Sequence, residues 1–207
     1  QGYLEFSKMG VPMPRLRVTK DHESILMTKG KYQEVYTCVM EYFEGKSFRK
    51  LPVTKRDVMK ITRFMAYMHQ SKLKPTHYYD TFGIVNFEHI YNQQAHILPM
   101  QERNEVKRTL EEFQQINLAK FRQSVIHGTL ERENILKDDQ GAYCILDLGC
   151  MDYNASIVDM ATFLANFTID MDGKETIQVI KESLTEYQKI HGLTADERLA
   201  LPLLIKT

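Results

Sequence analysis

Two segments in the second half of the chain carry the side chains best suited to chemistry. The first runs from His127 through Thr129 to Asn134, and the second is an apolar run that ends on Asp147. The polar turn 138–141 lies between them, so we expect a hairpin with Asn134 and Asp147 near one end. Magnesium binds few protein oxygens and completes its shell with water and phosphate oxygens, so this pair of side chains could hold Mg²⁺.

The elements that position these segments follow from hydrophobic periodicity. Strands are expected within residues 24–45, at Ile25–Met27 and Tyr36–Tyr42, because these runs are rich in strand-forming side chains. Helices are expected from the Thr54 and Asp57 cap to Met68, at about Glu102 to Arg122, from near Ser156, at about Lys174 to His191, and after a Thr194–Glu197 capping box. Strands first and helices afterwards, with one inserted hairpin, predict an α+β domain rather than a doubly wound sheet.

Apolar side chains at helical spacing give the inward faces of these helices. The expected inward residues are Val58, Ile61, Met65 and Met68 in the first helix, Val106, Leu110, Phe113 and Ile116 in the second, and Ile177, Ile180, Leu184 and Tyr187 in the helix that begins near Lys174. Gly192 is expected to stop that last helix.

Several stretches resemble the landmarks of one family. His127–Asn134 and Ile145–Gly149 resemble the catalytic and metal-binding segments of the aminoglycoside phosphotransferase and choline kinase superfamily, which has a protein-kinase-like fold. Further landmarks in the family's order are the Gly10–Leu16 proline motif, the Val39–Gly45 hinge, the Met65–His69 helix end and the Ile157–Ala161 helix start. Together they cover nearly the whole chain and are specific for the fold, but much less specific for a substrate.

The resemblance implies a two-lobed α+β fold. Residues 1–44 would be the remnant of a small, nucleotide-covering β lobe that ends at the hinge, and residues 45–207 would form a mainly helical large lobe with the catalytic loop and the metal-binding hairpin. No glycine-rich loop or lysine-bearing strand fits ahead of the proline motif, and the first residue is Gln1 rather than methionine. We therefore expect the chain to be a fragment, or the ordered part, of a longer kinase-like protein.

The resemblance also implies ATP and magnesium as cofactors. Asn134 and Asp147 would bind the Mg²⁺ that bridges the nucleotide phosphates. The residues expected around the adenine are Glu41 and Phe43 through their backbone, Met40 at the back of the pocket, and Leu136 and Leu146 on the face of the ring. Plainer interpretations stay open, because Asn134 and Asp147 could simply form turns and the others could be core residues of packed strands.

Position 129 departs from the family pattern, which has its catalytic aspartate where this chain has Thr129. A threonine hydroxyl cannot act as a general base near neutrality, and the loss of such a base removes roughly 3–5 kcal/mol of transition-state stabilisation. Phosphoryl transfer depends mostly on positioning and charge neutralisation, so residual activity is compatible with this change. Glu131 or Glu133 could stand in for the aspartate, although we rather expect both side chains to face solvent. A third alternative is that the threonine is an engineered replacement.

Three other polar residues near the proposed site are interpreted as structural. His127 belongs to the catalytic loop, where its ring is expected to hydrogen-bond to the backbone. Asp159 begins a helix and is expected to tie the catalytic loop down through the loop's backbone amides. His69 follows an apolar helix face and is expected to be a satisfied interior histidine rather than a ligand.

The acceptor side is less determined. Residues 75–98 are irregular and aromatic, and the resemblance implies that they help to shape the acceptor pocket. The acidic residues that could favour a cationic acceptor, such as an aminoglycoside or an amino alcohol, are Asp152, Asp159, Asp170 and Asp172. An ordinary solvated surface is the preferred interpretation of this group. The chain has no tryptophan, so a choline-type aromatic cage would need tyrosine and phenylalanine.

Composition excludes several classes of partner. The 27 basic and 27 acidic residues balance, so no bulk charge draws the chain to nucleic acid or to an anionic membrane. No apolar run approaches the roughly 20 residues that span a bilayer. Cys38, Cys144 and Cys150 lack metal-ligand spacing and are expected to be buried free thiols in a reducing compartment, with the cytoplasm as the default.

Two functions follow from these observations. The first is a small-molecule kinase that uses ATP and Mg²⁺ to phosphorylate a hydroxyl group and whose catalysis is impaired or unusual. The second is a kinase-like module that binds a nucleotide or a partner without turnover, which Thr129 favours. The pair Asn134 and Asp147 favours the first function, because a pocket that had abandoned nucleotide need not keep both oxygens. The acceptor and the oligomeric state are left open.

Overall fold

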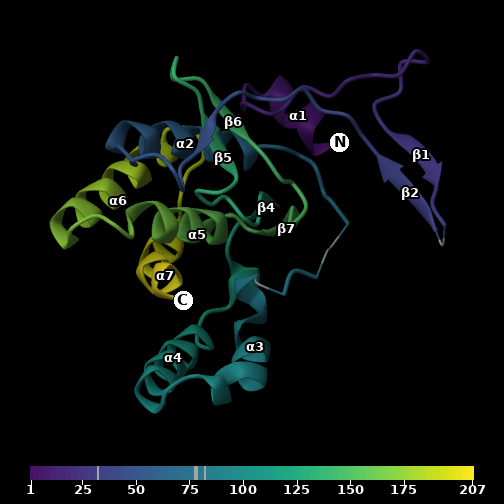
Figure 1. The fold of residues 1–207 in the computed structure, drawn as a ribbon. Coiled ribbons are helices and arrows are strands. Elements are labelled where there is room, and N and C mark those ends of the chain that lie inside the picture. Colours follow the sequence, from purple (N-terminus) through teal and green to yellow (C-terminus); the bar gives the residue numbers. More distant parts are fainter. Residues whose placement is uncertain (32, 77–78, 82) are drawn as a thin grey trace.

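The computed structural model describes residues 1–31, 33–76, 79–81 and 83–207 (Figure 1). Helices and short antiparallel strands confirm the expected α+β class. The helices are α1 (Gly2–Lys8), α2 (Lys55–Met68), α3 (Phe87–Gln94), α4 (Met100–Phe113), α5 (Ser156–Thr168), α6 (Gly173–Gln188) and α7 (Ala195–Lys206), with short 3-10 helices η1 (Ile84–Asn86), η2 (Ala95–Ile97) and η3 (Leu118–Lys120). The strands are β1 (Leu26–Lys29), β2 (Glu34–Thr37), β3 (Lys46–Ser47), β4 (Gln123–Ile126), β5 (Ile135–Lys137), β6 (Tyr143–Ile145) and β7 (Asp152–Ala155).

Strands β5 and β6 form the expected hairpin. They pair antiparallel with Ile135 opposite Ile145, and the amide of Leu146 donates to the carbonyl of Asn134 at 2.8 Å. The turn is held by the Asp138 carboxylate, which accepts hydrogen bonds from the amides of Gln140 and Ala142. Strand β3 pairs with the other edge of β5. The hairpin thereby places the start of β5 and the end of β6 together.

Strands β4 and β7 form a second pair, and β4 leads into residues 127–134, the segment that resembles the family's catalytic loop and is named after it here. Ile126, the last residue of β4, lies opposite Asp152, the first residue of β7. Strand β7 continues directly into α5, and the amide of Ser156 donates to the carbonyl of Arg122 at 3.0 Å. The loop that follows β4 is therefore close to the first turn of α5.

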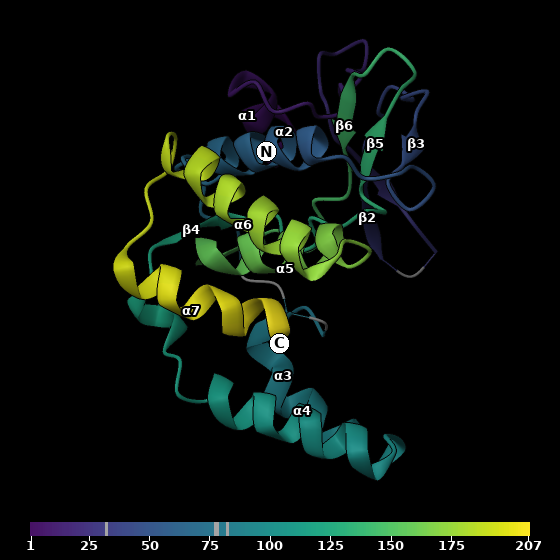
Figure 2. The ribbon, with the colours of Figure 1, turned by 90° about the vertical axis from the view of Figure 1, so that its left-hand side faces the viewer.

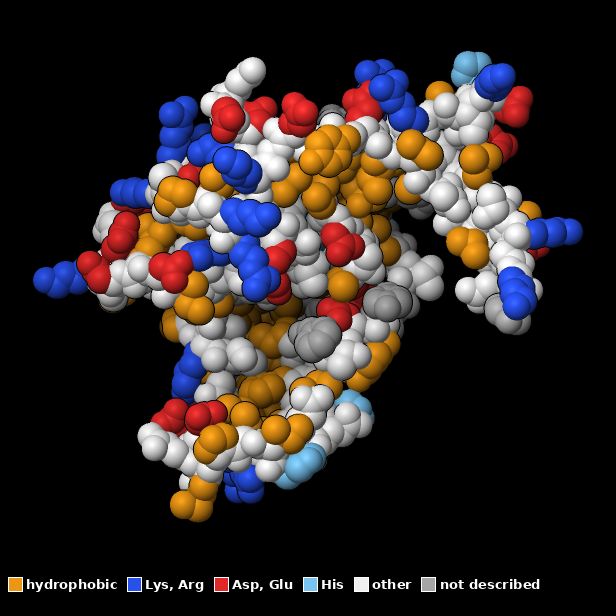
Figure 3. Space-filling view, in the orientation of Figure 1, with side chains coloured by type: hydrophobic (Ala, Val, Ile, Leu, Met, Phe, Trp, Pro, Cys, Tyr) orange, Lys and Arg blue, Asp and Glu red, His pale blue; other side chains and the backbone are white. Residues whose placement is uncertain are grey.

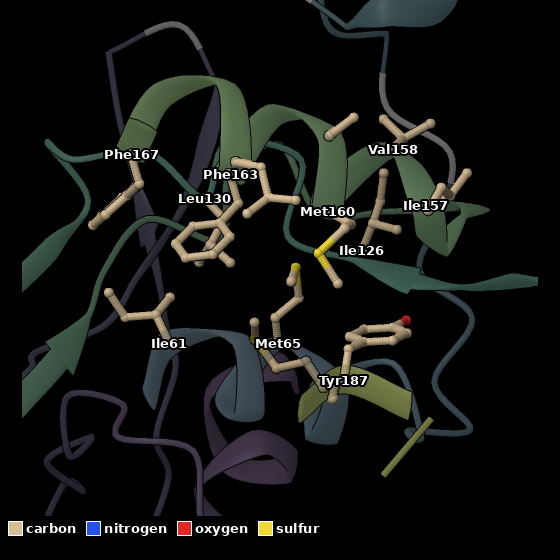
Figure 4. Close-up of a cluster of buried hydrophobic side chains, with 14 of the residues drawn as sticks. Ile61, Met65, Ile126, Leu130, Ile157, Val158, Met160, Phe163, Phe167 and Tyr187 are labelled. Carbon is tan, nitrogen blue, oxygen red and sulfur yellow. The ribbon is translucent and has the colours of Figure 1, made fainter. Parts of the chain in front are cut away.

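The core lies between α2 and α5. Figure 4 shows Ile61 and Met65 of α2 facing Phe163 and Phe167 of α5, with Leu130 of the catalytic loop among them. Leu130 is completely buried. Burying a leucine side chain contributes roughly 1.5–3 kcal/mol, so this residue anchors the loop to the helical core.

The helices stack around this core. Helix α6 packs against α2 and α7 packs against α5, and α3 with α4 lies beyond α7 at the bottom of the molecule (Figure 2). Two capping boxes expected from the sequence are present, at Thr54 with Asp57 for α2 and at Thr194 with Glu197 for α7. Each satisfies backbone amides that the first helical turn leaves free.

The strands before the hinge differ from the expectation. Strand β1 begins one residue later than Ile25. Strand β2 runs from Glu34 to Thr37, so the strand predicted over Tyr36–Tyr42 is wrong from Cys38 onward. The segment after Cys38 lies beside the proline motif instead, where Leu16 and Met40 form an isolated bridge. Every residue of β1 and β2 is exposed, and the pair stands away from the body (Figure 1).

Two helices also differ from the expectation. Helix α4 ends at Phe113 rather than near Arg122, because the chain turns into η3, where the Asn117 side chain caps the amide of Ala119. In α6 the predicted inward residue Ile177 is 56% exposed, and the buried positions are Val179, Ser183 and Tyr187. The helix therefore presents a face rotated from the one that its isoleucine and leucine spacing indicated.

The structure also bears on membrane-spanning helices and on the state of the cysteines. No helix in the described ranges is long and apolar enough to cross a membrane. All three cysteines are free, but only Cys144 is buried, while Cys38 is exposed and Cys150 is half-buried. The expectation of buried thiols is wrong for Cys38, because this residue directly follows strand β2, whose side chains are all exposed.

Candidate functional site

The catalytic loop is clamped by the carboxylate of Asp159 in α5. One oxygen accepts hydrogen bonds from the His127 amide at 2.6 Å and from His69 Nε2 at 3.1 Å, and the other accepts from the Gly128 amide at 2.9 Å. Burial acts to raise the pKa of this carboxyl, but the bonds and charges of His69 and His127 outweigh it and hold the pKa below its usual range. The structural role expected for Asp159 is confirmed by these contacts.

His69 completes the clamp from α2. Its ring is buried and also lies 2.7 Å, Nδ1 to hydroxyl oxygen, from Tyr187 of α6. The ring is thus satisfied on both nitrogens, as expected for an interior histidine. Helices α2, α5 and α6 are joined through this network to the first residues of the catalytic loop.

His127 joins the catalytic loop to the segment that carries Asp147. Its Nε2 is 2.9 Å from the carbonyl oxygen of Leu146, and its Nδ1 accepts from the Thr129 amide at 3.3 Å. These partners assign the proton to Nε2, because a carbonyl can only accept. Burial lowers the pKa of the imidazole, so the ring is neutral near pH 7 and acts by positioning the backbone.

Gly128 allows a close approach of these two segments. Its φ is +87°, in the left-handed region, and a Cβ atom there would lie 2.3 Å from the carbonyl oxygen of Cys150. A side chain at this position would force the catalytic loop and the segment after Asp147 apart.

Asn134 is oriented by the catalytic loop. Its Nδ2 donates to the carbonyl oxygen of Thr129 at 2.9 Å. The amide nitrogen is therefore turned toward the loop, which leaves Oδ1 as the oxygen that can coordinate a cation.

Asp147 lies at the same end of the hairpin. It directly follows Leu146, which pairs with Asn134 through the backbone, and its side chain is exposed. Its φ is +59°, an uncommon conformation for a residue other than glycine, and the Gly149 amide donates to Oδ1 at 3.0 Å. The other carboxylate oxygen has no partner within the described ranges. The residues thus fit a magnesium site with one amide oxygen and one carboxylate, a smaller donor set than a dedicated protein cage.

A dedicated cage is not seen. No cluster of three or more His, Cys, Asp or Glu side chains suited to a metal exists among the residues that the structure describes. Magnesium keeps several waters and substrate phosphates as ligands, so two protein oxygens suffice.

The residues expected around adenine lie on two walls. Asn134, Leu136 and Leu146 fall on one face of the β5–β6 hairpin, because strand side chains alternate and cross-strand partners share a face. Leu136 and Leu146 are half-buried, whereas Ile135 and Ile145 on the opposite face are fully buried. This leaves an apolar surface beside Asn134.

The hinge supplies backbone groups for a base. The Glu41 amide donates to the carbonyl of Arg15 at 2.9 Å, while the Glu41 carbonyl and the Phe43 amide take part in no backbone hydrogen bond among the described residues. These are the two groups that an adenine edge would use. Met40 is 40% exposed and lies in the bridge to Leu16.

A cavity of about 490 Å³ opens next to the catalytic loop on the side of α3 and α7. The loop contributes Gly128, Thr129 and Glu131 to its wall, and most other side chains on the wall are apolar, from α3, α5 and α7. Figure 3 shows hydrophobic side chains in a hollow between the lower helices and the body. The charged side chains among its lining residues are the carboxylates Asp80, Glu131 and Asp152, and no lysine or arginine lines it in the described part of the chain.

Thr129 faces this cavity without a well-formed hydrogen bond. Its Oγ1 is buried and lacks a partner of ordinary geometry in the part of the chain that is described. The Cys150 thiol lies beside it: burial raises the pKa of this thiol, the Asp80 and Asp147 carboxylates add to the rise, and the Thr129 hydroxyl opposes it.

The two glutamates of the loop have different surroundings. Glu131 lines the cavity, and burial together with the charges of Glu133 and Asp80 raises the pKa of its carboxyl. Glu133 is exposed and receives a hydrogen bond from Arg49 at 2.9 Å. Glu133 is not among the lining residues, so of the two only Glu131 lines the cavity.

The acidic group considered for cation binding is dispersed. Asp159 clamps the loop, Asp170 pairs with Arg132 at 2.5 Å, and Asp172 caps α6. Only Asp152 lines the cavity. Of the irregular segment 75–98, His77, Tyr78 and Phe82 lie outside the described residues.

Sequence reasoning missed two residues that the fold brings to the loop. Asp80 and Cys150 both line the cavity beside Thr129. Asp80 lies in an irregular segment, and Cys150 follows the hairpin by a turn, so neither had a periodic or motif signal that could have placed it.

Comparison with known proteins identifies the family. Residues 3–193 match the sequence model of the phosphotransferase enzyme family (APH), and the chain belongs to this family. A search of curated protein sequences gives no significant match.

Solved structures share the fold. An amicoumacin kinase in complex with AMP-PNP, Ca²⁺ and Ami has a TM-score of 0.68 at 12% identity, over 99% of this chain and 65% of that one. An aminoglycoside phosphotransferase from Alicyclobacillus acidocaldarius has a TM-score of 0.68 at 13% identity, over 99% of this chain and 67% of that one. A microcompartment-associated aminopropanol kinase has a TM-score of 0.60 at 16% identity, with 99% and 70% covered. The protein-kinase-like fold is confirmed, and the chain spans about two thirds of the length of these structures.

Proposed function

We propose that the protein transfers the γ-phosphoryl group of ATP to a hydroxyl group of a small molecule with the help of Mg²⁺. The observation that carries the proposal is the orientation of Asn134, whose amide nitrogen bonds the Thr129 carbonyl and leaves its oxygen at the hairpin end that also bears Asp147. The family relationship supports the same reaction class.

Each wall of the site has a role in this reaction. Asn134 and Asp147 would hold Mg²⁺, which when bound neutralises charge on the phosphates during transfer. The Glu41 carbonyl and the Phe43 amide would bind the adenine edge, with Met40 at the back of the pocket and Leu136 and Leu146 against the ring. His127 and the Asp159 clamp fix the loop between nucleotide and acceptor, so Thr129 marks the place of the acceptor hydroxyl.

The acceptor would bind in the cavity beside the loop. A volume of about 490 Å³ suits a small molecule, and the carboxylates on its apolar wall suit an acceptor that carries a positive charge, such as an amino alcohol or an aminoglycoside. We keep the cytoplasm as the compartment and a boundary at residue 44 between the small and large lobes as parts of the proposal.

A second function is favoured by one observation. Thr129 cannot accept a proton, so a module that binds nucleotide without turnover would use the same hinge and hairpin. The two functions share nucleotide binding and differ in turnover.

Calorimetric titration of ATP, with and without Mg²⁺, tests the shared step. We expect binding that requires Mg²⁺ in the wild type and is lost in Asp147→Ala. Asp139→Ala is the matched control, since Asp139 is exposed in the turn at the opposite end of the hairpin and should bind as the wild type does. Equal affinity with and without Mg²⁺, or an unchanged Asp147→Ala variant, would contradict the assignment of the metal site.

A further inference from the structure

The proposed function leaves one role in the cavity without a residue. A proton acceptor next to the acceptor hydroxyl would accelerate the transfer, and Thr129 cannot serve as one. The cavity wall offers the carboxylates of Asp80, Glu131 and Asp152 in the described part of the chain. Their surroundings differ, and the differences select one of them.

Asp80 is held in place by its backbone. Its carbonyl oxygen accepts hydrogen bonds from the Gly83 amide at 3.0 Å and from Asn86 Nδ2 at 2.6 Å. These bonds close the turn that leads into η1 and α3, so Asp80 occupies a fixed position at the edge of the cavity although it lies outside any helix or strand.

The side chain of Asp80 reaches the catalytic loop. Its carboxylate acts on the Cys150 thiol, the same thiol that lies beside the Thr129 hydroxyl and within the field of Asp147. It also acts on the carboxyl of Glu131. Asp80 and Thr129 thus share the Cys150 thiol as a neighbour, and all three residues line the same cavity.

The other carboxylates have different surroundings. Glu131 belongs to the loop itself, where its amide donates to the Thr129 carbonyl at 2.8 Å, and the charges of Glu133 and Asp80 act on its carboxyl. Asp152 is the first residue of β7, lies opposite Ile126 in the strand pair and is buried. Of the three cavity carboxylates, Asp80 acts most strongly on the Cys150 thiol beside Thr129.

We propose that Asp80 supplies the carboxylate that accepts the proton of the acceptor hydroxyl, in the role that position 129 has lost. In this step the acceptor oxygen forms a bond to the γ-phosphorus of ATP, and the bond from that phosphorus to the β,γ-bridging oxygen breaks. The electron pair leaves with ADP, and the hydroxyl proton passes to Asp80 and then to solvent. The inference rests on the proposed phosphotransfer.

The test uses MgATP as the probe and water as the acceptor. ADP release is measured for the wild type, for Asp80→Asn and Asp80→Glu, and for Asp139→Asn as a control outside the site, while MgATP affinity is measured calorimetrically. We expect Asp80→Asn to lose about 100-fold or more in kcat with unchanged MgATP affinity, because general base catalysis is worth about that factor. Asp80→Glu should retain part of the rate, and Asp139→Asn should retain all of it.

A double variant separates catalysis from structure. Thr129→Asp in the Asp80→Asn background should restore turnover, because it returns a carboxylate to the acceptor without repairing any contact of residue 80. An Asp80→Asn variant that matches the wild type in kcat, or a wild type that binds MgATP without any turnover, overturns the role of Asp80 and leaves nucleotide binding intact. A wild type that does not bind MgATP overturns the proposed function as well.

Discussion

Asp159 is the residue on which the geometry of the site depends most. Its two carboxylate oxygens accept from the amides of His127 and Gly128 and from the ring of His69, and the side chain is fully buried. In Asp159→Asn, one of the two oxygens becomes an NH₂ group that faces a donor. At least one buried amide then loses its partner.

The cost follows from these contacts. A buried donor without a partner costs about 1–3 kcal/mol, and the remaining hydrogen bonds lose the benefit of a charged acceptor. Breaking a buried charged network typically costs about 3–5 kcal/mol, so we expect the free energy of unfolding to fall by about that amount. This is a large fraction of the roughly 5–15 kcal/mol that stabilises a domain.

Urea denaturation followed by circular dichroism measures the change, with Asp170→Asn as the control. Asp170 pairs with Arg132 at the surface and is 75% exposed, so its loss should cost less than about 1 kcal/mol. Because folding lowers the pKa of Asp159, its contribution is present above its unfolded pKa of about 3.9 and is lost as the pH falls through the folded value. If Asp159→Asn cost no more than Asp170→Asn, the clamp would not hold the loop.

Three further predictions concern the same region. Gly128→Ala should lower the free energy of unfolding by more than Gly141→Ala does. Both glycines have a positive φ, which costs about 1–2 kcal/mol for alanine. Only the Cβ atom at position 128 would collide with Cys150, whereas no atom lies within 4 Å of a Cβ atom at position 141. Leu130→Ala should lower the free energy of unfolding by about 2–5 kcal/mol in urea denaturation, since it empties a fully buried site. Burial lowers the pKa of His191 to about 4, so stability should fall as the pH drops from about 6.5 toward 4, and less so in His191→Gln.

Each of these has a clear contradicting result. Equal losses in the two glycine variants would mean that the contact with Cys150 does not constrain the loop. A Leu130→Ala variant as stable as the wild type would mean that the loop is not anchored by its side chain. Stability falls with falling pH because His191 binds its proton at a higher pH in the unfolded chain than in the folded protein. If the free energy of unfolding had the same pH dependence in the wild type and in His191→Gln, His191 would be excluded as the cause.

The sequence predicted the hairpin because its signals are local. The turn at Asp138, the apolar runs on either side and the spacing from His127 to Asn134 all lie within one short stretch. The cap at Thr54 and the box at Thr194 are local for the same reason, and both are present.

What the sequence did not predict depends on contacts between distant segments. The inward face of α6 is set by its packing on α2, so Val179 is buried while Ile177 is exposed, although Tyr187 is buried as predicted. The last part of the strand predicted to end at Tyr42 pairs with the proline motif, where the Glu41 amide donates to the Arg15 carbonyl, and not with a neighbouring strand. Asp80 acts on Cys150 because an irregular turn brings it to the cavity, and such a turn has no hydrophobic periodicity from which its position could be predicted.

Phosphoryl transfer itself is the most direct test of the account. The protein is incubated with ATP, Mg²⁺ and a panel of hydroxylated amines, and the mixture is followed by phosphorus NMR for ADP and for a new phosphate monoester, with Thr129→Asp in parallel. The account predicts a monoester that grows with ADP in the wild type and faster in Thr129→Asp. Bound ATP that stays unchanged in both proteins would contradict it and would leave a nucleotide-binding module without turnover.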